Sequence, residues 1–173
     1  PLFSKGLVCF IGGNHGENRK NGKAYTTFAD NKDVMLAEEL QEIFHESQDY
    51  KKTLDFIIPD SELHVTIDVS DTVLLLLHGH PMRGAGNSQA KARKWLSDQA
   101  FSRNATADAD IVLHGHYHYF SAYESSDRLI LQAPTLDSGS EWFENTKGDK
   151  SRAGMLTFVI GGSAKWDYIK VIR

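Results

Sequence analysis

The sequence predicts an α/β fold in which helices lie among the strands early in the chain and strands alone follow late. Short apolar runs rich in valine, isoleucine and leucine recur along the 173 residues, which is typical of strands. Two longer segments instead repeat their apolar residues every three or four positions, which is typical of helices. The length fits one domain and no repeat or linker divides the chain, so we expect a single domain over residues 1–173.

The early elements are bounded by residues that start or stop regular structure. Gly12 and Gly13 allow a sharp turn after the first strand. Asp30 or Asn31 can cap the first helix, and Pro59 stops the strand that follows it. In order, this part is expected to contain a strand at 7–11, a polar loop at 16–27, a helix at 33–50 and strands at 54–58 and 64–69.

The later part is expected to form the centre of the sheet and its final hairpin. Residues 73–77 are apolar throughout, which is typical of a central strand covered on both faces. Gly161 and Gly162 suit the turn between the last two strands. This part is expected to contain strands at 73–77, 111–113, 119–123, 129–133, 155–160 and 166–172, and a helix at 88–101.

Charge and composition limit the classes of function. The net charge of −4 gives no general attraction to nucleic acid, so such a contact would need a local basic patch. The single cysteine, Cys9, rules out an internal disulfide and fits a reducing compartment. The longest apolar run, residues 73–77, is far shorter than the roughly 20 residues that cross a bilayer. No signal peptide pattern is present, so we expect a cytoplasmic protein with no membrane partner.

Amide and imidazole side chains occur in three places, each just after a predicted strand. Imidazole is the commonest protein metal ligand, and the asparagine amide oxygen suits a harder cation. Taken singly, each place has an ordinary explanation as an Asx turn or as solvated histidines. Together they favour a metal site, because strands that end at one sheet edge can bring such side chains together. His116 and His118 are alternating residues of a segment expected to be extended, so they should face the same side. The residues are Asn14, His15, His78, His80, His116 and His118.

The order Gly-Asn-His, then a strand-ending His, then Gly-His-x-His resembles the calcineurin-like metallophosphoesterases. The resemblance spans nearly the whole chain as an ordered framework. It implies a metallophosphoesterase-type β-sandwich flanked by helices, in α-β-β-α layers. It also implies two divalent metal ions (Mn, Fe or Zn) and hydrolysis of a phosphate ester by a metal-bound hydroxide. We expect a phosphodiester substrate, with a nuclease as one form of the activity.

Carried over by position, the resemblance assigns roles to the motif residues. His15 would not bind metal, but would protonate the leaving oxygen or stabilise charge on it. His80 could contact substrate, support a ligand or exchange roles with His78, which we prefer as ligand because it directly follows the strand. One ion would be bound by Asn14, His78 and His116, and the other by His118.

The loop after His15 carries two further expectations. Gly16 stands where the family usually has an acidic residue, so we expect Glu17 to serve as the group that orients His15. Arg19 lies near two lysines in this loop and could reach a phosphate. We therefore assign Arg19, together with His80, to substrate binding.

One part of the family pattern is missing. The family opens with Asp-x-His after its first strand and an Asp after its second, which bridges the metals, whereas the residues before Asn14 contain neither Asp nor His. We expect the chain to be the C-terminal part of a larger domain, here lacking its first strands, with an upstream segment or another chain completing the site. The alternatives are a phosphomonoesterase or small cyclic-nucleotide phosphodiesterase, which the mildly acidic charge favours, and an inactive phosphoesterase fold acting as a binding or scaffold subunit.

Overall fold

The computed structural model of this chain describes residues 4–59, 62–137, 139, 144–145, 152–162 and 164–173. The chain divides into two compact units, Pro1–Val65 and Thr66–Arg173, and each is described by itself. Each unit contains strands and an α-helix, so the prediction of an α/β fold is confirmed. Within the described ranges, no helix combines the length and the apolar composition needed to cross a bilayer.

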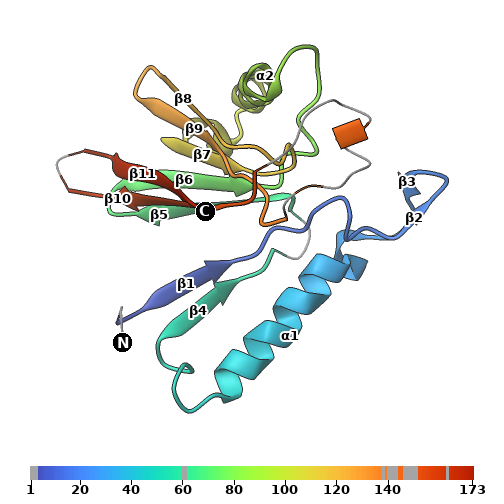
Figure 1. Ribbon diagram of the computed structural model, residues 1–173, viewed down its shortest axis with the longest axis vertical. Coiled ribbons are helices and arrows are strands. Elements are labelled where there is room, and N and C mark those ends of the chain that lie inside the picture. Colours follow the sequence, from blue (N-terminus) through green and yellow to red (C-terminus); the bar gives the residue numbers. More distant parts are fainter. Residues whose placement is uncertain (1–3, 60–61, 138, 140–143, 146–151, 163) are drawn as a thin grey trace. The chain divides into compact units, whose positions relative to one another are not determined.

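The first unit pairs β1 with β4 in parallel, and α1 lies in the connection between them (Figure 1). Helix α1 starts directly after Asn31, one of the two predicted caps, whose side chain accepts a hydrogen bond from the Asp33 N–H. It ends before the predicted residue 50, because the backbone is already extended at Ser47. The rings of Phe44 on α1 and Phe56 on β4 have centroids 5.9 Å apart, so the helix packs on this strand pair. In chain order the unit holds β1 (Gly6–Cys9), β2 (Arg19–Lys20), β3 (Lys23–Ala24), the 3-10 helix η1 (Phe28–Asp30), α1 (Lys32–Glu46) and β4 (Leu54–Ile57).

The segment predicted as a polar loop contains a short hairpin, β2–β3. Its turn residues Asn21 and Gly22 have φ angles of 52° and 76°. Positive φ at both central residues is what a type I′ turn requires, and this turn matches the twist of paired strands. The prediction of an irregular loop was wrong here, and the Asn-Gly pair was the signal that could have revealed the hairpin.

The second unit is built on a five-stranded sheet with the order β5-β6-β7-β9-β8. Strands β6, β7 and β9 run parallel, and β8 is antiparallel to β9. Strands β10 and β11 form a separate antiparallel pair. The elements are β5 (His64–Val69), β6 (Thr72–Leu77), α2 (Ser88–Phe101), the 3-10 helix η2 (Ala105–Asp108), β7 (Ile111–His114), β8 (Ser121–Ser125), β9 (Arg128–Gln132), β10 (Met155–Ile160) and β11 (Trp166–Ile172).

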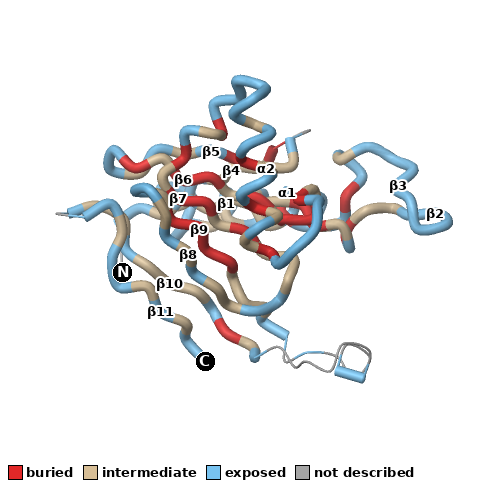
Figure 2. The backbone as a smooth tube through the Cα atoms, turned by 90° about the horizontal axis from the view of Figure 1, so that it is seen from above, coloured by how far each residue is buried: buried red, intermediate tan, exposed pale blue. Residues whose placement is uncertain are grey.

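Strand β6 is covered on both faces, as its sequence predicted. Leu75 and Leu77 belong to the apolar cluster that includes Ala92 and Leu96 of α2. Leu74 belongs to a second cluster, against which side chains of β10 and β11 pack. Successive strand residues point to opposite faces, so α2, the sheet and the β10–β11 pair form three layers. The buried backbone, red in Figure 2, runs along β6, β7 and β9.

Candidate functional site

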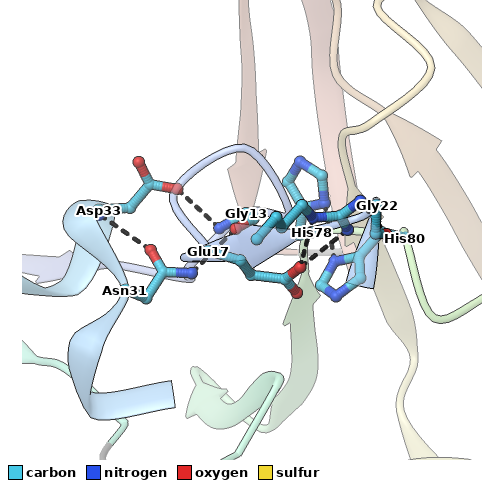
Figure 3. Close-up of polar contacts among 8 residues, drawn as sticks. Gly13, Glu17, Gly22, Asn31, Asp33, His78 and His80 are labelled. Carbon is cyan, nitrogen blue, oxygen red and sulfur yellow. Dashed lines mark hydrogen bonds and ion pairs between the residues drawn. The ribbon is translucent and has the colours of Figure 1, made fainter. Parts of the chain in front are cut away.

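The Asn-His motif lies on a loop of the first unit, residues 12–16, that the start of α1 holds in place. The Gly13 N–H donates to Asp33 Oδ2 at 2.8 Å, and Asn31 Nδ2 donates to the Gly13 carbonyl oxygen at 2.9 Å (Figure 3). Asn31 is only 2% exposed, and its Oδ1 accepts from the Asp33 N–H. The side chains of Asp33, on α1, and of its cap Asn31 therefore fix the N–H and the carbonyl group of Gly13. Sequence reasoning found Asn31 only as a helix cap and missed Asp33.

Gly16 closes this loop, and the structure explains why a glycine stands there. A Cβ at Gly16 would lie 2.1 Å from Asn31 Oδ1 and 2.7 Å from the carboxylate carbon of Asp33. The Asp33 carboxylate thus already occupies the space next to Gly16, the position at which the resemblance of the motifs would lead one to expect an acidic residue. The Gly16 carbonyl oxygen also accepts from the Lys32 N–H at 2.9 Å. The loop is therefore anchored to α1 both before and after the Asn-His pair.

Asn14 and His15 differ in their surroundings. Asn14 Oδ1 is buried, and no hydrogen-bond donor reaches it among the described residues. Buried polar atoms in folded proteins nearly always have a partner, so an oxygen left without one suits a bound cation. His15 is exposed, which suits a side chain that must reach a substrate.

Glu17 and Arg19 are engaged with each other in the first unit. Arg19 Nε donates to Glu17 Oε2 at 2.9 Å, and Arg19 Nη1 donates to the Gly22 carbonyl oxygen at 3.4 Å. The residue expected to bind substrate thus also supports the β2–β3 hairpin, and the carboxylate expected to orient His15 accepts from Arg19. The Arg19 side chain is 41% exposed, and such surface pairs contribute only about 0–1 kcal/mol. Opening this pair towards a phosphate therefore costs little.

The histidine motifs of the second unit follow the carboxyl ends of two neighbouring parallel strands. Leu77 at the end of β6 pairs in register with His114 at the end of β7. The Gly115 N–H then donates to the His78 carbonyl oxygen at 3.0 Å. The two chains therefore leave the sheet side by side, and the rings of His78 and His116 have centroids 5.0 Å apart.

His80 completes a group of three imidazoles. His78 Nδ1 and His80 Nδ1 lie 3.0 Å apart (Figure 3), and the ring centroids of His80 and His116 are 6.4 Å apart. Gly79 between the first two has a φ of 106°, a backbone conformation that favours glycine. We call His78, His80 and His116 the histidine cluster.

The distance between the two Nδ1 atoms fits a pair of metal ligands. Zinc–nitrogen bonds are about 2.0–2.1 Å long, so two nitrogens on one tetrahedral or octahedral ion lie roughly 2.9–3.4 Å apart. Without metal, the same 3.0 Å separation is a hydrogen bond whose donor depends on the tautomers. No group of three His, Cys, Asp or Glu side chains is arranged to hold an ion in the described part of the chain. The cluster is therefore not a closed metal site, and the Nδ1 contact leaves His80 able either to exchange with His78 as a ligand or to support its ring.

The backbone of the Gly-His-x-His segment differs from the prediction. Strand β7 ends at His114, and His116 and His118 have φ angles of 72° and 67°. The expectation that an extended segment would align these two side chains was wrong, because left-handed residues interrupt the alternation of a strand. His118 is exposed, whereas His116 is half-buried.

His114 supports the cluster from inside the sheet. It is 2% exposed, and its Nδ1 lies 3.1 Å from the Gly115 carbonyl oxygen. Burial lowers the pKa of His114 more than this hydrogen bond raises it, and because a carbonyl oxygen can only accept, Nδ1–H donates to Gly115. His114 thereby helps to fix the backbone from which His116 projects.

Comparisons with known proteins find likeness at low sequence identity. No protein-family model matches the sequence, and no curated protein sequence matches it. Similar solved structures include wild-type Vps29 of Entamoeba histolytica complexed with Zn²⁺, which is 12% identical, with a TM-score of 0.47 over 91% of this chain and 86% of that one. Vps29 of Chaetomium thermophilum is 13% identical, with a TM-score of 0.48 over 91% and 67%. A novel archaeal phosphodiesterase is 15% identical, with a TM-score of 0.41 over 83% and 64%. At these identities the likeness concerns the fold alone and assigns no activity to this chain.

Proposed function

We propose that this chain is a metal-dependent phosphoesterase whose substrate is a phosphodiester. The histidine cluster carries the proposal, because imidazoles from the ends of β6 and β7 lie with ring centroids 5.0–6.4 Å apart. His78 and His116 are proposed to bind one divalent ion. Asn14 is proposed as its third ligand, which the buried, unpartnered Oδ1 supports. His118 is proposed to bind a second ion.

A divalent ion held by these residues would lower the pKa of water and neutralise phosphate oxygens. The chain itself must supply a proton to the departing oxygen, and His15 is proposed for this task. General acid catalysis contributes about 10²–10⁴-fold and requires a side chain at a fixed place. The hydrogen bonds from α1 and its cap to Gly13 and Gly16 support this role, since they hold the backbone on both sides of His15.

Substrate binding is proposed for His80 and Arg19. Strands β2 and β3 also expose Lys20 and Lys23, so the hairpin presents three basic side chains close together. This favours a polynucleotide, and hence a nuclease, among the possible phosphodiesters. If so, Arg19→Ala combined with Lys23→Ala weakens polynucleotide binding and flattens its salt dependence. If the hairpin does not bind a polynucleotide, the two changes leave hydrolysis of a small aryl phosphodiester unaffected and the polymer is not bound at all.

The metal content follows from ligand chemistry. Imidazole suits zinc and iron better than manganese. A second cation about 3.5–4 Å from the first would be repelled unless an anionic ligand lies between them. We propose that a carboxylate from a further segment or another chain supplies that ligand.

Zinc titration of the metal-free protein tests the ligand assignment. The wild type is expected to bind one ion per chain. His78→Ala is expected to weaken zinc binding more than His80→Ala, whose effect should be about 10–100-fold if His80 only supports a ligand. His45→Ala, on α1, is the control and should leave zinc binding unchanged. The reverse order of the two variants would contradict the assignment, and absence of zinc binding by the wild type would overturn the site.

Turnover of bis(4-nitrophenyl) phosphate tests the acid. His15→Ala should lower it by about 100-fold or more with zinc affinity unchanged, since His15 is not a proposed ligand. Loss of zinc together with turnover would show that His15 is a ligand. Equal rates with the corresponding monoester would favour a phosphomonoesterase.

A second proposal belongs to another class, an inactive phosphoesterase fold that serves as a binding subunit. The observation in its favour is that the described residues hold no group of three metal-binding side chains of the His, Cys, Asp and Glu types. This second proposal predicts that zinc-saturated protein hydrolyses neither bis(4-nitrophenyl) phosphate nor the corresponding monoester. Turnover that is lost in His15→Ala would exclude it.

A further inference from the structure

A cavity of about 360 Å³ lies in the second unit, between the C-terminal half of α2 and the β8–β9 hairpin. Arg93 and Ser97 line it from the helix, and Ser126 and Arg128 line it from the hairpin. Its volume lies at the lower end of the range, about 300–1,000 Å³, that is usual for small-molecule sites. Nothing in the proposed phosphoesterase chemistry uses this cavity.

The cavity lies at the opposite end of the parallel strands from the histidine cluster. Strand β9 pairs with β7 so that Gln132 lies beside His114 and Leu129 beside Ile111. Arg128 is the first residue of β9, four positions before Gln132, which corresponds to roughly 13 Å along a strand. A ligand bound here would therefore be separate from one bound at the histidines.

The charge of the cavity is opposite to that of the chain. Two guanidinium groups line it and no carboxylate does, although the chain carries a net charge of −4. Arginine is always charged and presents a planar set of donors that matches phosphate and carboxylate oxygens. The cavity is therefore suited to an anion.

Both arginines are held in place by contacts within the unit. Arg93 Nη1 donates to the Tyr123 hydroxyl at 3.2 Å, and its guanidinium lies 5.7 Å from the centre of that ring. Arg128 Nη2 donates to the Ala107 carbonyl oxygen. Each guanidinium carries five N–H donors, so these bonds orient the group while leaving it further donors for a ligand.

Serine hydroxyls and two apolar side chains also line the cavity, and they indicate which kind of anion it can bind. Ser125 and Ser126 add hydroxyl groups to the two guanidiniums, whereas the Ser97 hydroxyl already donates to the Arg93 carbonyl oxygen. The two guanidiniums and two hydroxyls still hold more donors than the two oxygens of a carboxylate can use. A phosphate monoester has three terminal oxygens and a charge near −2, which matches two arginines. Leu96 and Ile130, 5% and 4% exposed, add apolar surface beneath. We propose that this cavity binds an organic phosphate monoester, with its phosphate at Arg93 and Arg128 and its apolar part over Leu96 and Ile130.

Titration of the metal-free protein with phenyl phosphate, followed by amide chemical shifts, tests this site without loading the proposed metal site. Shifts are expected in the C-terminal half of α2 and in the β8–β9 hairpin. Arg93→Gln and Arg128→Gln should each weaken binding by about tenfold or more, the usual scale for a lost hydrogen bond to a charged group. Arg103→Gln, which removes the same charge just beyond α2, is the matched control and should bind like the wild type.

A further variant guards against effects on folding. Ala100→Glu keeps both arginines and adds a carboxylate on the exposed helix surface that lines the cavity, so it should weaken phenyl phosphate binding at least as much. Absence of shifts with millimolar probe, or equal weakening by Arg103→Gln, would overturn the site. Equally tight benzoate would overturn the choice of phosphate, and equally tight inorganic phosphate would overturn the role of the apolar floor. Failure of hydrolysis elsewhere in the protein bears on none of these outcomes.

Discussion

Replacement of Gly16 by alanine tests whether the start of α1 positions the Asn-His loop. The new Cβ would lie 2.1 Å from Asn31 Oδ1, whereas ordinary contacts begin at 3.4 Å, so the two groups must separate by 1.3 Å. Asn31 is 2% exposed and makes hydrogen bonds at 2.9 Å with Asp33 and with Gly13. A shift of that size breaks both. At about 1 kcal/mol for the helix cap and about 1 kcal/mol for the other bond, we expect a loss of at least about 2 kcal/mol in the free energy of unfolding.

Urea denaturation of the variant measures this loss, and a double-mutant cycle identifies its cause. In an Asn31→Gly background the clashing oxygen is absent, so Gly16→Ala should cost at least about 1 kcal/mol less there, within the range that contacting residues show. Gly115→Ala is the control for the substitution itself, because Gly115 lacks a positive φ and a Cβ there would meet only the His78 carbonyl oxygen, at an ordinary contact distance of 3.6 Å. A Gly16→Ala variant as stable as the wild type would refute the packing argument. An unchanged cost in the Asn31→Gly background would show that Asn31 is not the obstacle.

Two further predictions concern the second unit. Hydrogen bonds from Lys165 and from the Val73 backbone N–H, together with nearby positive charge, lower the pKa of Asp110. The ionised Asp110 carboxylate therefore stabilises the folded state above the unfolded pKa near 3.9. This stabilisation is lost as pH falls through the folded pKa. Asp110→Asn should therefore be less stable than the wild type at pH 7 but nearly equal to it well below pH 3.9 in denaturant unfolding; a constant difference would contradict this. Leu75→Ala, at a fully buried position, should lose about 2–5 kcal/mol, whereas Leu36→Ala, 53% exposed, should stay within about 0.5 kcal/mol of the wild type; equal losses would refute the assignment of the core.

Elements with a strong local pattern of apolar residues were predicted closely. Helix α2 spans Ser88–Phe101 as predicted from apolar residues at helical spacing, and the structure adds that Asn87 caps it. Strand β6 was recognisable because burial on both faces requires an uninterrupted apolar run. The β2–β3 hairpin lacks such a run, since its strand residues are exposed and three of the four are basic, and only its turn carried a signal.

The contacts that shape the candidate site were less predictable. His78 and His116 could be expected near each other, because both follow strands that turn out to be neighbours in one sheet. The contacts of Asn31 and Asp33 with Gly13 join residues 18 and 20 positions apart. These contacts depend on how α1 packs against the β1–β4 pair, and no local sequence pattern specifies that packing. The same contacts leave no room for a side chain at Gly16, so a departure from the family motif becomes intelligible only in three dimensions.

Backbone strain distinguishes the Gly-His-x-His segment from the other turns. Most non-glycine residues with positive φ lie where a tight turn requires it, as in the pairs Ser70–Asp71 and Ser126–Asp127 between antiparallel strands or sheet neighbours. His116 and His118, like Tyr168 within β11, have positive φ outside any hairpin turn, at a cost on the order of 1–2 kcal/mol for each such residue. Backbone strain of this kind persists where the surrounding structure fixes it, and it concentrates at functional sites. Here the bonds of Gly115 to His78 and of Thr135 to the His118 carbonyl oxygen fix the segment. Glycine at either position would relieve the strain, so two strained histidines at this sheet edge are consistent with the proposed ligand roles.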